Sequence, residues 1–271
     1  MNVAVVGHVE WIRFARVDRV PGPGEIVHSF EDWEQAGGGG AVAALQLACL
    51  ADEVTLFTAL GDDELGRRAE SELEERGVRV HASRDRLPTR WALTHVDESG
   101  ERTITTIGPK LRPKGTDDRL PWHELAGKDA VVFVAGDVEA LLRARRARLL
   151  TATTRELDVL RRGGVVLDAL VGSGEDAAER FRPGDLDPAP ALVVATSGPL
   201  GGWMQPGGPF RAATPPGPVE DTYGAGDCFL AGLTFALAAG REPVEAVAFA
   251  AHCGAAALTG RGVAPQPVAL S

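Results

Sequence analysis

Short runs of valine, leucine and alanine recur along the chain, each bounded by turn-forming residues. Such runs are typical of strands buried on both faces of a parallel sheet, since neither face alternates with polar residues. The expected strands are Val3–Val6, Val54–Leu60, Val131–Val134, Val165–Leu167 and Leu192–Ala195. Segments with helical spacing separate or follow them, which predicts helices at Ala41–Ala51, Leu65–Arg76, Val138–Leu149, Glu175–Phe181, Asp227–Ala239 and Val244–Leu258. This alternation predicts an α/β fold whose central sheet is mostly parallel, with helices on both faces.

Two segments interrupt the alternation. The first, Arg13–Glu31, ends in the strand-like run Glu25–Phe30. The second, Thr89–Ile107, contains two alternating runs, Arg90–Asp97 and Arg102–Ile107, joined by a polar turn that contains a glycine. We interpret both segments as antiparallel strands inserted between α/β units. The alternative for each is a hairpin that faces solvent, which the alternation alone does not exclude.

Composition restricts the class of protein. The chain has 271 residues, 44% of them hydrophobic, which is enough for one sizeable core and a small appendage. No apolar run approaches the ~18 residues that span a bilayer, and the first residues lack a basic leader, so we expect a cytoplasmic protein. The net charge of −10 argues against nucleic-acid binding. Cys49, Cys228 and Cys253 lie in apolar, helix-like settings without metal-ligand spacing, and we predict buried free thiols.

The most informative motif is the run Asp221-Thr222-Tyr223-Gly224-Ala225-Gly226-Asp227, which stands directly before an apolar helix start. Amide groups at the beginning of a helix lack intrahelical partners, and the helix dipole favours negative charge beside them. The amides of Gly224, Ala225 and Gly226 are therefore a candidate anion site. A carboxylate in the same turn is explained if Asp227 removes a proton from the group that attacks the bound anion. This combination favours phosphoryl transfer. The alternative is an Asp that caps a helix after a flexible turn.

The same run resembles the signature Asp-Thr-x-Gly-Ala-Gly-Asp of the ribokinase-like, or PfkB, carbohydrate kinases, in which only x is free. The resemblance implies a single ribokinase-like domain over residues 1–271 that transfers the γ-phosphoryl group of ATP to a hydroxyl of a sugar or sugar-like molecule. It assigns the general base to Asp227 and the anion hole to Gly224–Gly226. It also places Thr222 beside the nucleotide and a monovalent cation such as K⁺ near Asp221.

A second part of the resemblance is the glycine run Gly37–Gly40, which precedes a predicted helix. Four glycines in a row let the backbone approach a ligand closely, because no Cβ stands in the way. In the family this loop holds the hydroxyls of the acceptor, which assigns substrate contacts to Gly38 and Gly39. The chain departs from the ribokinase pattern here, since Gly39 replaces a usual Lys and Val42 a sugar-binding Asn.

The segment after the first strand also departs from the family, which has Asn-x-Asp where this chain has Glu10 and Ile12. Positions 10 and 12 share one face of a strand, so Glu10 is a candidate substrate ligand. The alternative is a surface residue at a lid hinge, and the two interpretations have about equal weight. Arg90, in the second inserted segment, is a further candidate to contact the acceptor or the phosphoryl group.

The nucleotide and magnesium assignments rest on weaker patterns. The strand end that contains Thr196, Gly198 and Gly201 resembles the family's Thr-x-Gly-x-x-Gly turn beneath ATP, and His252 would flank the adenine. By themselves, such a turn is a common connector and a histidine on an apolar face is more often a packing residue. The family's Asn-x-x-Glu element, which organises Mg²⁺, lacks its Asn here, and Glu179 is the chosen carboxylate. The alternative is an acidic residue that is favoured near a helix start.

The resemblance further implies that the inserted segments, about 10–32 and 88–108, pair into a small antiparallel lid over the sugar site, through which two copies form a homodimer. A lid would keep water from replacing the acceptor hydroxyl. Three alternatives remain open: a nucleoside kinase of the same fold, a sensor that binds nucleotide or sugar without turnover, and a dinucleotide-dependent oxidoreductase. The last has little support, because no Gly-x-Gly-x-x-Gly follows the first strand.

Overall fold

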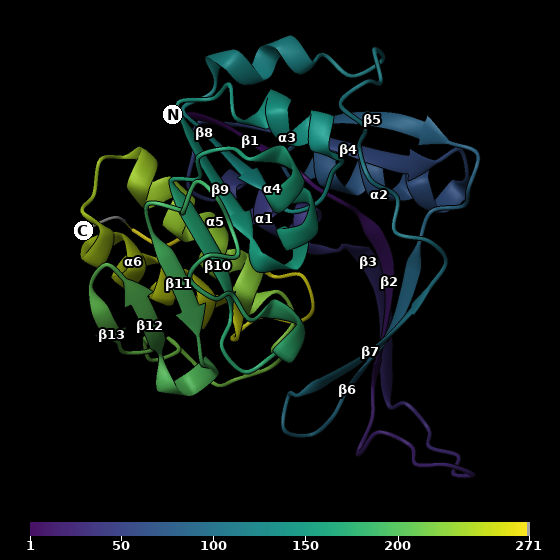
Figure 1. Ribbon diagram of the computed structural model, residues 1–271. Helices are drawn as coiled ribbons and strands as arrows, with labels where there is room; N and C mark the ends of the chain where they lie inside the picture. Colours follow the sequence, from purple (N-terminus) through teal and green to yellow (C-terminus); the bar gives the residue numbers. More distant parts are fainter. Residues whose placement is uncertain (270–271) are drawn as a thin grey trace.

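The computed structural model describes residues 1–269, and Figure 1 shows a large α/β body from which a narrow sheet projects. Within those residues the main sheet has the strand order β13-β12-β11-β10-β9-β8-β1-β4-β5. Antiparallel pairing is confined to β11, β12 and β13, so the expected mostly parallel sheet is confirmed. The strands are β1 Asn2–Val6, β4 Glu53–Gly61, β5 Arg79–Asp85, β8 Ala130–Phe133, β9 Leu149–Thr153, β10 Ala169–Ser173, β11 Val193–Thr196, β12 Gly202–Gln205 and β13 Gly208–Phe210.

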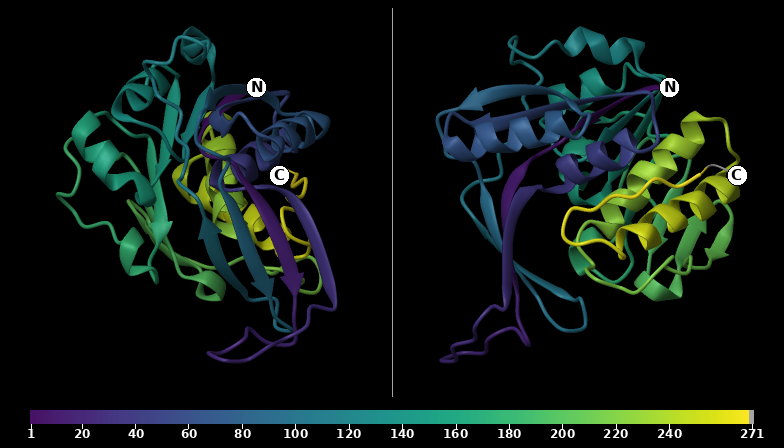
Figure 2. Two further views of the ribbon diagram at one scale, coloured as in Figure 1. Left: turned by 90° about the vertical axis from the view of Figure 1, so that its right-hand side faces the viewer. Right: turned by 180° about the vertical axis from the view of Figure 1, so that it is seen from behind.

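Helices cover both faces of this sheet, as the alternation predicts (Figure 2). One face carries α1 (Gly39–Ala48), α5 (Ala225–Ala238) and α6 (Pro243–Ala257), which pack on one another. The opposite face carries α3 (Val138–Ala144) and α4 (Leu157–Gly163), while α2 (Glu64–Glu75) packs on β4, β5 and the projecting sheet. Short 3₁₀ turns lie at Trp122–Gly127, Thr154–Glu156, Ala177–Glu179 and Gly198–Leu200.

The central strands explain why both faces need covering. In β1, Val3 and Val5 pack with the apolar residues of α1 and α5, whereas Ala4 and Val6 pack with those of α3 and α4. Successive side chains of a strand point to opposite faces, so a strand that is apolar at every position has to be buried on both sides. The apolar run of β1 therefore fixes its place inside the sheet, between β4 and β8.

The projecting sheet is the expected lid, and its four strands have the order β3-β2-β6-β7. Its outer pairs are antiparallel, and its central pair, β2 with β6, is parallel. The chain passes from the end of β1 through residues 7–9 directly into β2, so the lid begins at the carboxyl end of the sheet (Figure 1). The lid strands are β2 Glu10–Arg16, β3 Glu31–Gly37, β6 Trp91–Val96 and β7 Arg102–Ile107.

Several predicted elements are wrong in place or type. The strand expected at Val165–Leu167 lies at Ala169–Ser173, because α4 ends at Gly163, its cap Gly164 is left-handed, and the next residues lead back to the sheet. The helix expected at Val138–Leu149 stops at Ala144, and β9 begins at Leu149. Only a 3₁₀ turn forms within Glu175–Phe181, and Glu25–Phe30 is not a strand, since β3 starts at Glu31.

The cysteine prediction holds for two residues and fails for the third. Cys228 and Cys253 are buried in α5 and α6. Cys49 is exposed, because it caps the C-terminal end of α1, where the chain leaves the core. Separately, no helix between residues 1 and 269 combines the length and the apolar character needed to cross a bilayer.

Candidate active site

The glycine run and the end of β1 lie against each other at the carboxyl edge of the sheet. The amide of Gly40 donates a hydrogen bond to the His8 carbonyl at 3.1 Å. A Cβ on Gly7 would lie 2.7 Å from the Gly40 Cα, and Gly38 has a φ of +85°, so this close packing requires glycine. The loop before α1 thus forms a floor made of backbone.

A second glycine turn, at the start of α5, faces this floor. The amide of Gly38 donates to the hydroxyl of the buried Tyr223 at 2.9 Å, which ties the two turns together. A Cβ on Gly39 would lie 2.9 Å from the Oδ1 atom of Asp227. The structure therefore places the Asp227 carboxylate directly over Gly39, and it brings together three residues that the sequence assigned to one site.

The Asp227 carboxylate has an unusual protonation equilibrium. Its pKa is raised from 3.8 to about 6, chiefly by burial and also by the nearby Glu179, while Arg155, Arg102 and Lys110 act in the opposite direction. A carboxylate with a pKa near the working pH is suited to accept a proton during a reaction. Asp227 is therefore placed and tuned as a candidate general base.

The amides beside Asp227 are available to an anion. The first backbone hydrogen bond of α5 runs from Cys228 to the Gly224 carbonyl, at 2.9 Å. The N–H groups of Ala225, Gly226 and Asp227 precede that bond and have no partner among the described residues. Gly226 is exposed, and a Cβ there would meet nothing within 4 Å. The predicted anion site thus has unpaired donors and open space, beside a carboxylate.

Glu10 is not a surface residue, and that alternative is wrong. It is only 6% exposed, and its Oε1 atom lies 3.1 Å from Arg90 Nη1 and 3.6 Å from His8 Nε2. A Cβ on Gly38 would lie 3.2 Å from the Glu10 Cγ, so the side chain runs along the glycine floor. The structure brings Glu10 and Arg90 to the same floor as Asp227.

The turn before Asp227 is held to the lid. Thr222 accepts a hydrogen bond from Arg102 at 2.9 Å and donates one to the Gly100 carbonyl at 3.3 Å, both in the hairpin of β6 and β7. Asp221 is fully buried and accepts hydrogen bonds from the amides of Tyr223 (2.7 Å) and Gly262 (3.0 Å). Burial raises the pKa of Asp221. The contacts of Thr222 and Asp221 are therefore with protein groups, and their assigned ligands remain predictions.

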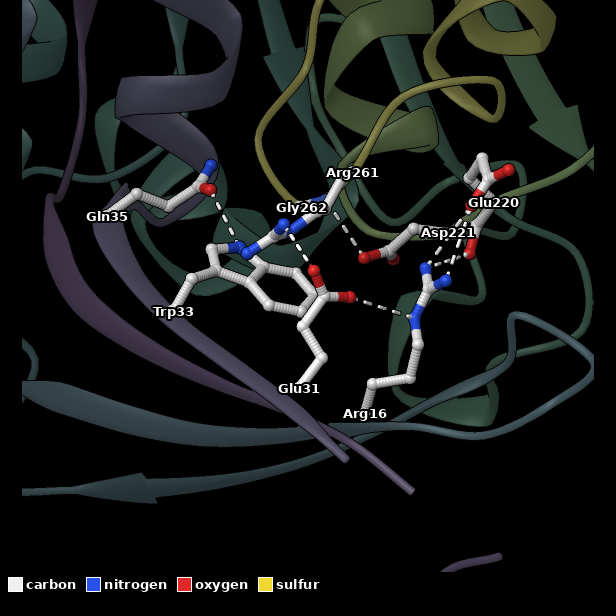
Figure 3. A network of polar contacts seen from close by, with 8 residues as sticks. All are labelled: Arg16, Glu31, Trp33, Gln35, Glu220, Asp221, Arg261 and Gly262. Atoms are coloured by element: carbon white, nitrogen blue, oxygen red, sulfur yellow. Dashed lines mark hydrogen bonds and ion pairs between the residues drawn. The ribbon is translucent and has the colours of Figure 1, made fainter. Parts of the chain in front are cut away.

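Figure 3 shows how a second set of lid residues reaches the same turn. Arg16 of β2 lies 3.3 Å from Glu220 and 3.8 Å from Glu31, while Glu31 also pairs with Arg261. The Arg261 guanidinium stacks on Trp33 of β3, 3.9 Å from the ring centroid. These contacts join β2, β3 and the 261–262 turn to residues 220–221, so the lid is tied to the turn that precedes Asp227.

The predicted nucleotide turn and Glu179 lie next to each other. Thr196 ends β11, and its carbonyl accepts a hydrogen bond from Gly174, which follows β10 (2.8 Å). Glu179 accepts from the Ser173 amide at 2.9 Å and pairs with Arg155. Gly198 is open to solvent and Gly201 has a φ of +93°, which produces the tight turn. Glu179 is also close enough to Asp227 to raise its pKa.

His252 lies apart from these groups. Gly254, two positions further along α6, contacts the Ala225 carbonyl of α5, and two helical positions are about 200° apart. His252 accordingly faces outward, in a hollow beside Glu245, Phe249 and Val268. An adenine contact from this side chain remains a prediction without geometric support.

Sequence reasoning missed several charged residues of the site. They are His8, Arg102, Lys110, Arg112, Arg155 and Glu156. His8 is buried, and its pKa lies well below the ordinary value because of burial and of the cations Lys110, Arg90, Arg112 and Arg155. Arg155 and Glu156 lie in the 3₁₀ turn that follows β9. The hydrophobic pattern did not predict β9, so neither residue was expected to stand at the end of a strand.

Comparison with known proteins identifies relatives of the whole chain. The sequence matches the profile described as pfkB family carbohydrate kinase over residues 1–171 and 167–269. An ATP-dependent ribose-1-phosphate kinase from Halopiger xanaduensis is 26% identical over 296 residues, which cover 99% of this chain and 96% of that protein.

Solved structures show the same fold at lower identity. A ribokinase from Giardia lamblia superposes with a TM-score of 0.80 at 18% identity, over 98% of this chain and 96% of that one. An adenosine kinase from Sinorhizobium meliloti superposes with a TM-score of 0.78 at 21% identity, over 99% and 97% of the two chains. The superpositions confirm the arrangement of sheet, helices and lid.

Proposed function

The chain belongs to the pfkB family of carbohydrate kinases and is therefore a phosphotransferase, and on that premise we propose how it works. It transfers the γ-phosphoryl group of ATP to a hydroxyl of a sugar-type small molecule, and Asp227 is the general base. One observation carries this proposal: a carboxylate with a pKa of about 6 lies over the Gly39 backbone, beside the unpaired amides of Ala225 and Gly226.

Few groups of the protein take part directly in the proposed reaction. The acceptor hydroxyl lies beside the Asp227 carboxylate, and Asp227 accepts its proton as the oxygen attacks the γ-phosphorus and ADP leaves. The amides of Gly224–Gly226 donate hydrogen bonds to the phosphoryl oxygens, where charge is spread in the transition state. A pKa of about 6 leaves Asp227 mostly ionised at neutral pH and therefore able to accept this proton.

ATP is the proposed donor because the relative from Halopiger xanaduensis is an ATP-dependent kinase. The turn at Thr196–Gly201 is the proposed seat of its phosphates, since it adjoins Gly174 and the Glu179 loop.

A magnesium ion fits this end of the site only in part. Residues 1–269 contain no group of three or more His, Cys, Asp or Glu side chains arranged to hold a metal. Mg²⁺ keeps several waters and needs one or two carboxylates besides the phosphates, and Glu179 provides one. When bound, the ion would neutralise charge on the phosphates. Glu179 already accepts from Ser173 and pairs with Arg155, and it holds both groups in place around the phosphates.

The chemical class of the acceptor is supported less directly than the donor. The similar proteins named above act, by their names, on ribose, adenosine or ribose 1-phosphate. The backbone groups of the glycine floor and the Glu10 carboxylate beside it are polar partners of the kind that a ring with several hydroxyls needs. We therefore propose a sugar or sugar derivative as acceptor, and a nucleoside as the second candidate.

The test measures ADP formation by a coupled assay, with sugars, sugar phosphates and nucleosides as acceptors. The proposal expects transfer to at least one acceptor and a loss of 100-fold or more in kcat for Asp227→Asn, with ATP affinity nearly unchanged. ATP binding without transfer to any acceptor would favour a sensor. A variant that keeps most of its turnover would remove Asp227 from the mechanism.

A further inference from the structure

Tyr223 is the only tyrosine of the chain, and it stands at the position that the Asp221–Asp227 signature leaves free. Its side chain is nevertheless buried, with 8% of the residue exposed. The ring packs edge-on against Phe14 of β2, with the centroids 5.3 Å apart, and Phe14 stacks on Trp33 of β3. The Tyr223 ring is therefore held in one place between the start of α5 and the lid.

The Tyr223 hydroxyl accepts one hydrogen bond and donates none within the protein. The Gly38 amide donates to the Tyr223 Oη atom at 2.9 Å. A phenol can also donate, but among residues 1–269 no oxygen or nitrogen atom accepts the hydrogen of this group. A buried donor without a partner is unfavourable and uncommon in folded proteins. The O–H of Tyr223 is therefore available to a bound molecule.

This hydroxyl lies on the same short stretch of backbone as the candidate base. A Cβ on Gly37 would lie 2.9 Å from the Tyr223 Oη atom, and a Cβ on Gly39 would lie 2.9 Å from Asp227 Oδ1. Two residues of extended chain span at most about 7 Å. One small molecule on the glycine floor can therefore contact both the phenol and the carboxylate.

The charges near the phenol keep its hydrogen in place. Burial raises the pKa of Tyr223, and the carboxylates of Glu10 and Asp227 raise it as well, against the opposing effects of the Gly38 amide and Arg102. Tyr223 is therefore protonated at neutral pH and acts as a hydrogen-bond donor. It does not compete with Asp227 for the proton of the attacking hydroxyl.

We propose that Tyr223 determines acceptor specificity: its O–H donates a hydrogen bond to a second hydroxyl of the acceptor, while the hydroxyl to be phosphorylated faces Asp227. The class of acceptor that this contact selects carries at least two hydroxyl groups, as sugars, polyols and nucleosides do. No covalent bond forms or breaks at Tyr223, because Asp227 takes the proton. The inference rests on the proposed function, since it concerns the acceptor of that same site.

The experiment combines Tyr223→Phe with acceptors that lack single hydroxyl groups. The pairs are ribose with 2-deoxyribose, glucose with 2-deoxyglucose and 3-deoxyglucose, and adenosine with its 2′-deoxy and 3′-deoxy forms. The matched control is Phe14→Leu, which loosens the packing of the Tyr223 ring and leaves its hydroxyl in place. Melting curves monitor the folding of both variants.

For one of these hydroxyls, we expect the native protein to prefer the complete acceptor by about 10-fold or more in kcat/KM, because a site that donates to a hydroxyl rejects the analogue without it. Tyr223→Phe should reduce this preference to less than about threefold, and Phe14→Leu should retain it. If Tyr223 only holds the Gly38 amide, Tyr223→Phe lowers kcat/KM equally for both members of every pair. That result, or a panel without any such preference, would overturn the inference.

A spectroscopic test avoids substitution. Because the chain has a single tyrosine, incorporation of 3-fluorotyrosine labels the Tyr223 ring alone. Saturation with the preferred acceptor should shift the fluorine NMR resonance, and saturation with its deoxy analogue should shift it clearly less. Equal shifts with both molecules would contradict a contact between the phenol and that hydroxyl.

Calorimetric binding of the same pairs without ATP separates the two proposals. A preference in affinity that Tyr223→Phe removes, with no ADP formed in any assay, would refute the kinase function and retain the Tyr223 contact. Phosphoryl transfer with a preference that survives Tyr223→Phe would retain the kinase function and refute the contact.

Discussion

Replacing Asp227 by Asn should stabilise the protein while it removes activity. Asn has nearly the same shape but no charge, so it escapes the cost of ionising a buried carboxyl group. The pKa of Asp227 is about 6 in the folded chain against an ordinary 3.8. Each pH unit between two such values is worth about 1.4 kcal/mol, so ionised Asp227 destabilises the native state by about 3 kcal/mol.

The stabilisation by Asp227→Asn depends on pH, because the folded and the unfolded chain lose the Asp227 proton at different pH values. Between pH 3.8 and 6 the folded chain holds a proton on Asp227 that the unfolded chain has lost, so stability decreases as the pH rises through this window. Above pH 6 both states are ionised, and the full cost remains. The advantage of Asp227→Asn over the native protein is therefore largest at pH 8, and it falls to about half that size at pH 5.

Urea unfolding at pH 5 and pH 8 measures this difference. In a thermal scan the same effect corresponds to a rise of about 5–10 °C at pH 8. Asp118→Asn is the control, since it removes one charge from an exposed position and should change the stability by less than about 0.5 kcal/mol. A variant no more stable than the native protein at pH 8, or equally improved at both pH values, would refute the argument from burial.

As the pH rises toward 6, the activity of the native enzyme should increase while its stability decreases. The base must be ionised to accept a proton, so kcat/KM of the native enzyme should fall tenfold per pH unit below about pH 6. Gains in stability that accompany loss of turnover are expected where a residue is held in an unfavourable environment for function.

Three further predictions follow from the packing around the site. Gly39→Ala places a Cβ 2.8 Å from Val134 Cγ1 and 2.9 Å from Asp227 Oδ1, so kcat should fall about 100-fold or more while circular dichroism shows an intact fold. Tyr223→Phe leaves the Gly38 amide without its acceptor, and urea unfolding should show a loss of about 1–3 kcal/mol. Arg102→Ala removes the contact between the lid hairpin and Thr222. It should raise both the acceptor KM and the ATP hydrolysis without acceptor about threefold or more, and unchanged values would show that the hairpin does not retain the acceptor.

The architecture could be predicted where sequence pattern and local chemistry agree. Val3–Val6 is apolar on both faces and lies in an interior strand, β1, between β4 and β8. The edge strand β5 and the strand β12, next to the other edge, were missed because they mix polar with apolar residues. The boundary between α3 and β9 was missed for a related reason: Leu149 continues the helical spacing, and only its pairing with β8 makes it a strand.

The residues of the site also fall into those that the local sequence predicts and those that it does not. The glycine run and the Asp221–Asp227 turn are local signals, and the structure places them against each other. Lys110, Arg112 and Glu156 gave no such signal, because a cation cluster exists only when segments from the lid and from the end of β9 meet. Residues that set a local backbone conformation can be predicted from the sequence around them. Residues that together set a charge distribution can be identified only when the fold brings them close to one another.

The cations around Asp227 change its pKa when substrates bind. In the free chain Arg155, Arg102 and Lys110 oppose the effect of burial on the Asp227 pKa. The phosphates of the proposed donor would neutralise Arg155, the first of these cations, which weakens that opposition, and exclusion of water by the bound acceptor would add to the effect of burial. Asp227 is then a stronger base when both substrates are bound than when either is absent. A base that is weak in the empty site and strong when both substrates are bound would limit phosphoryl transfer to water.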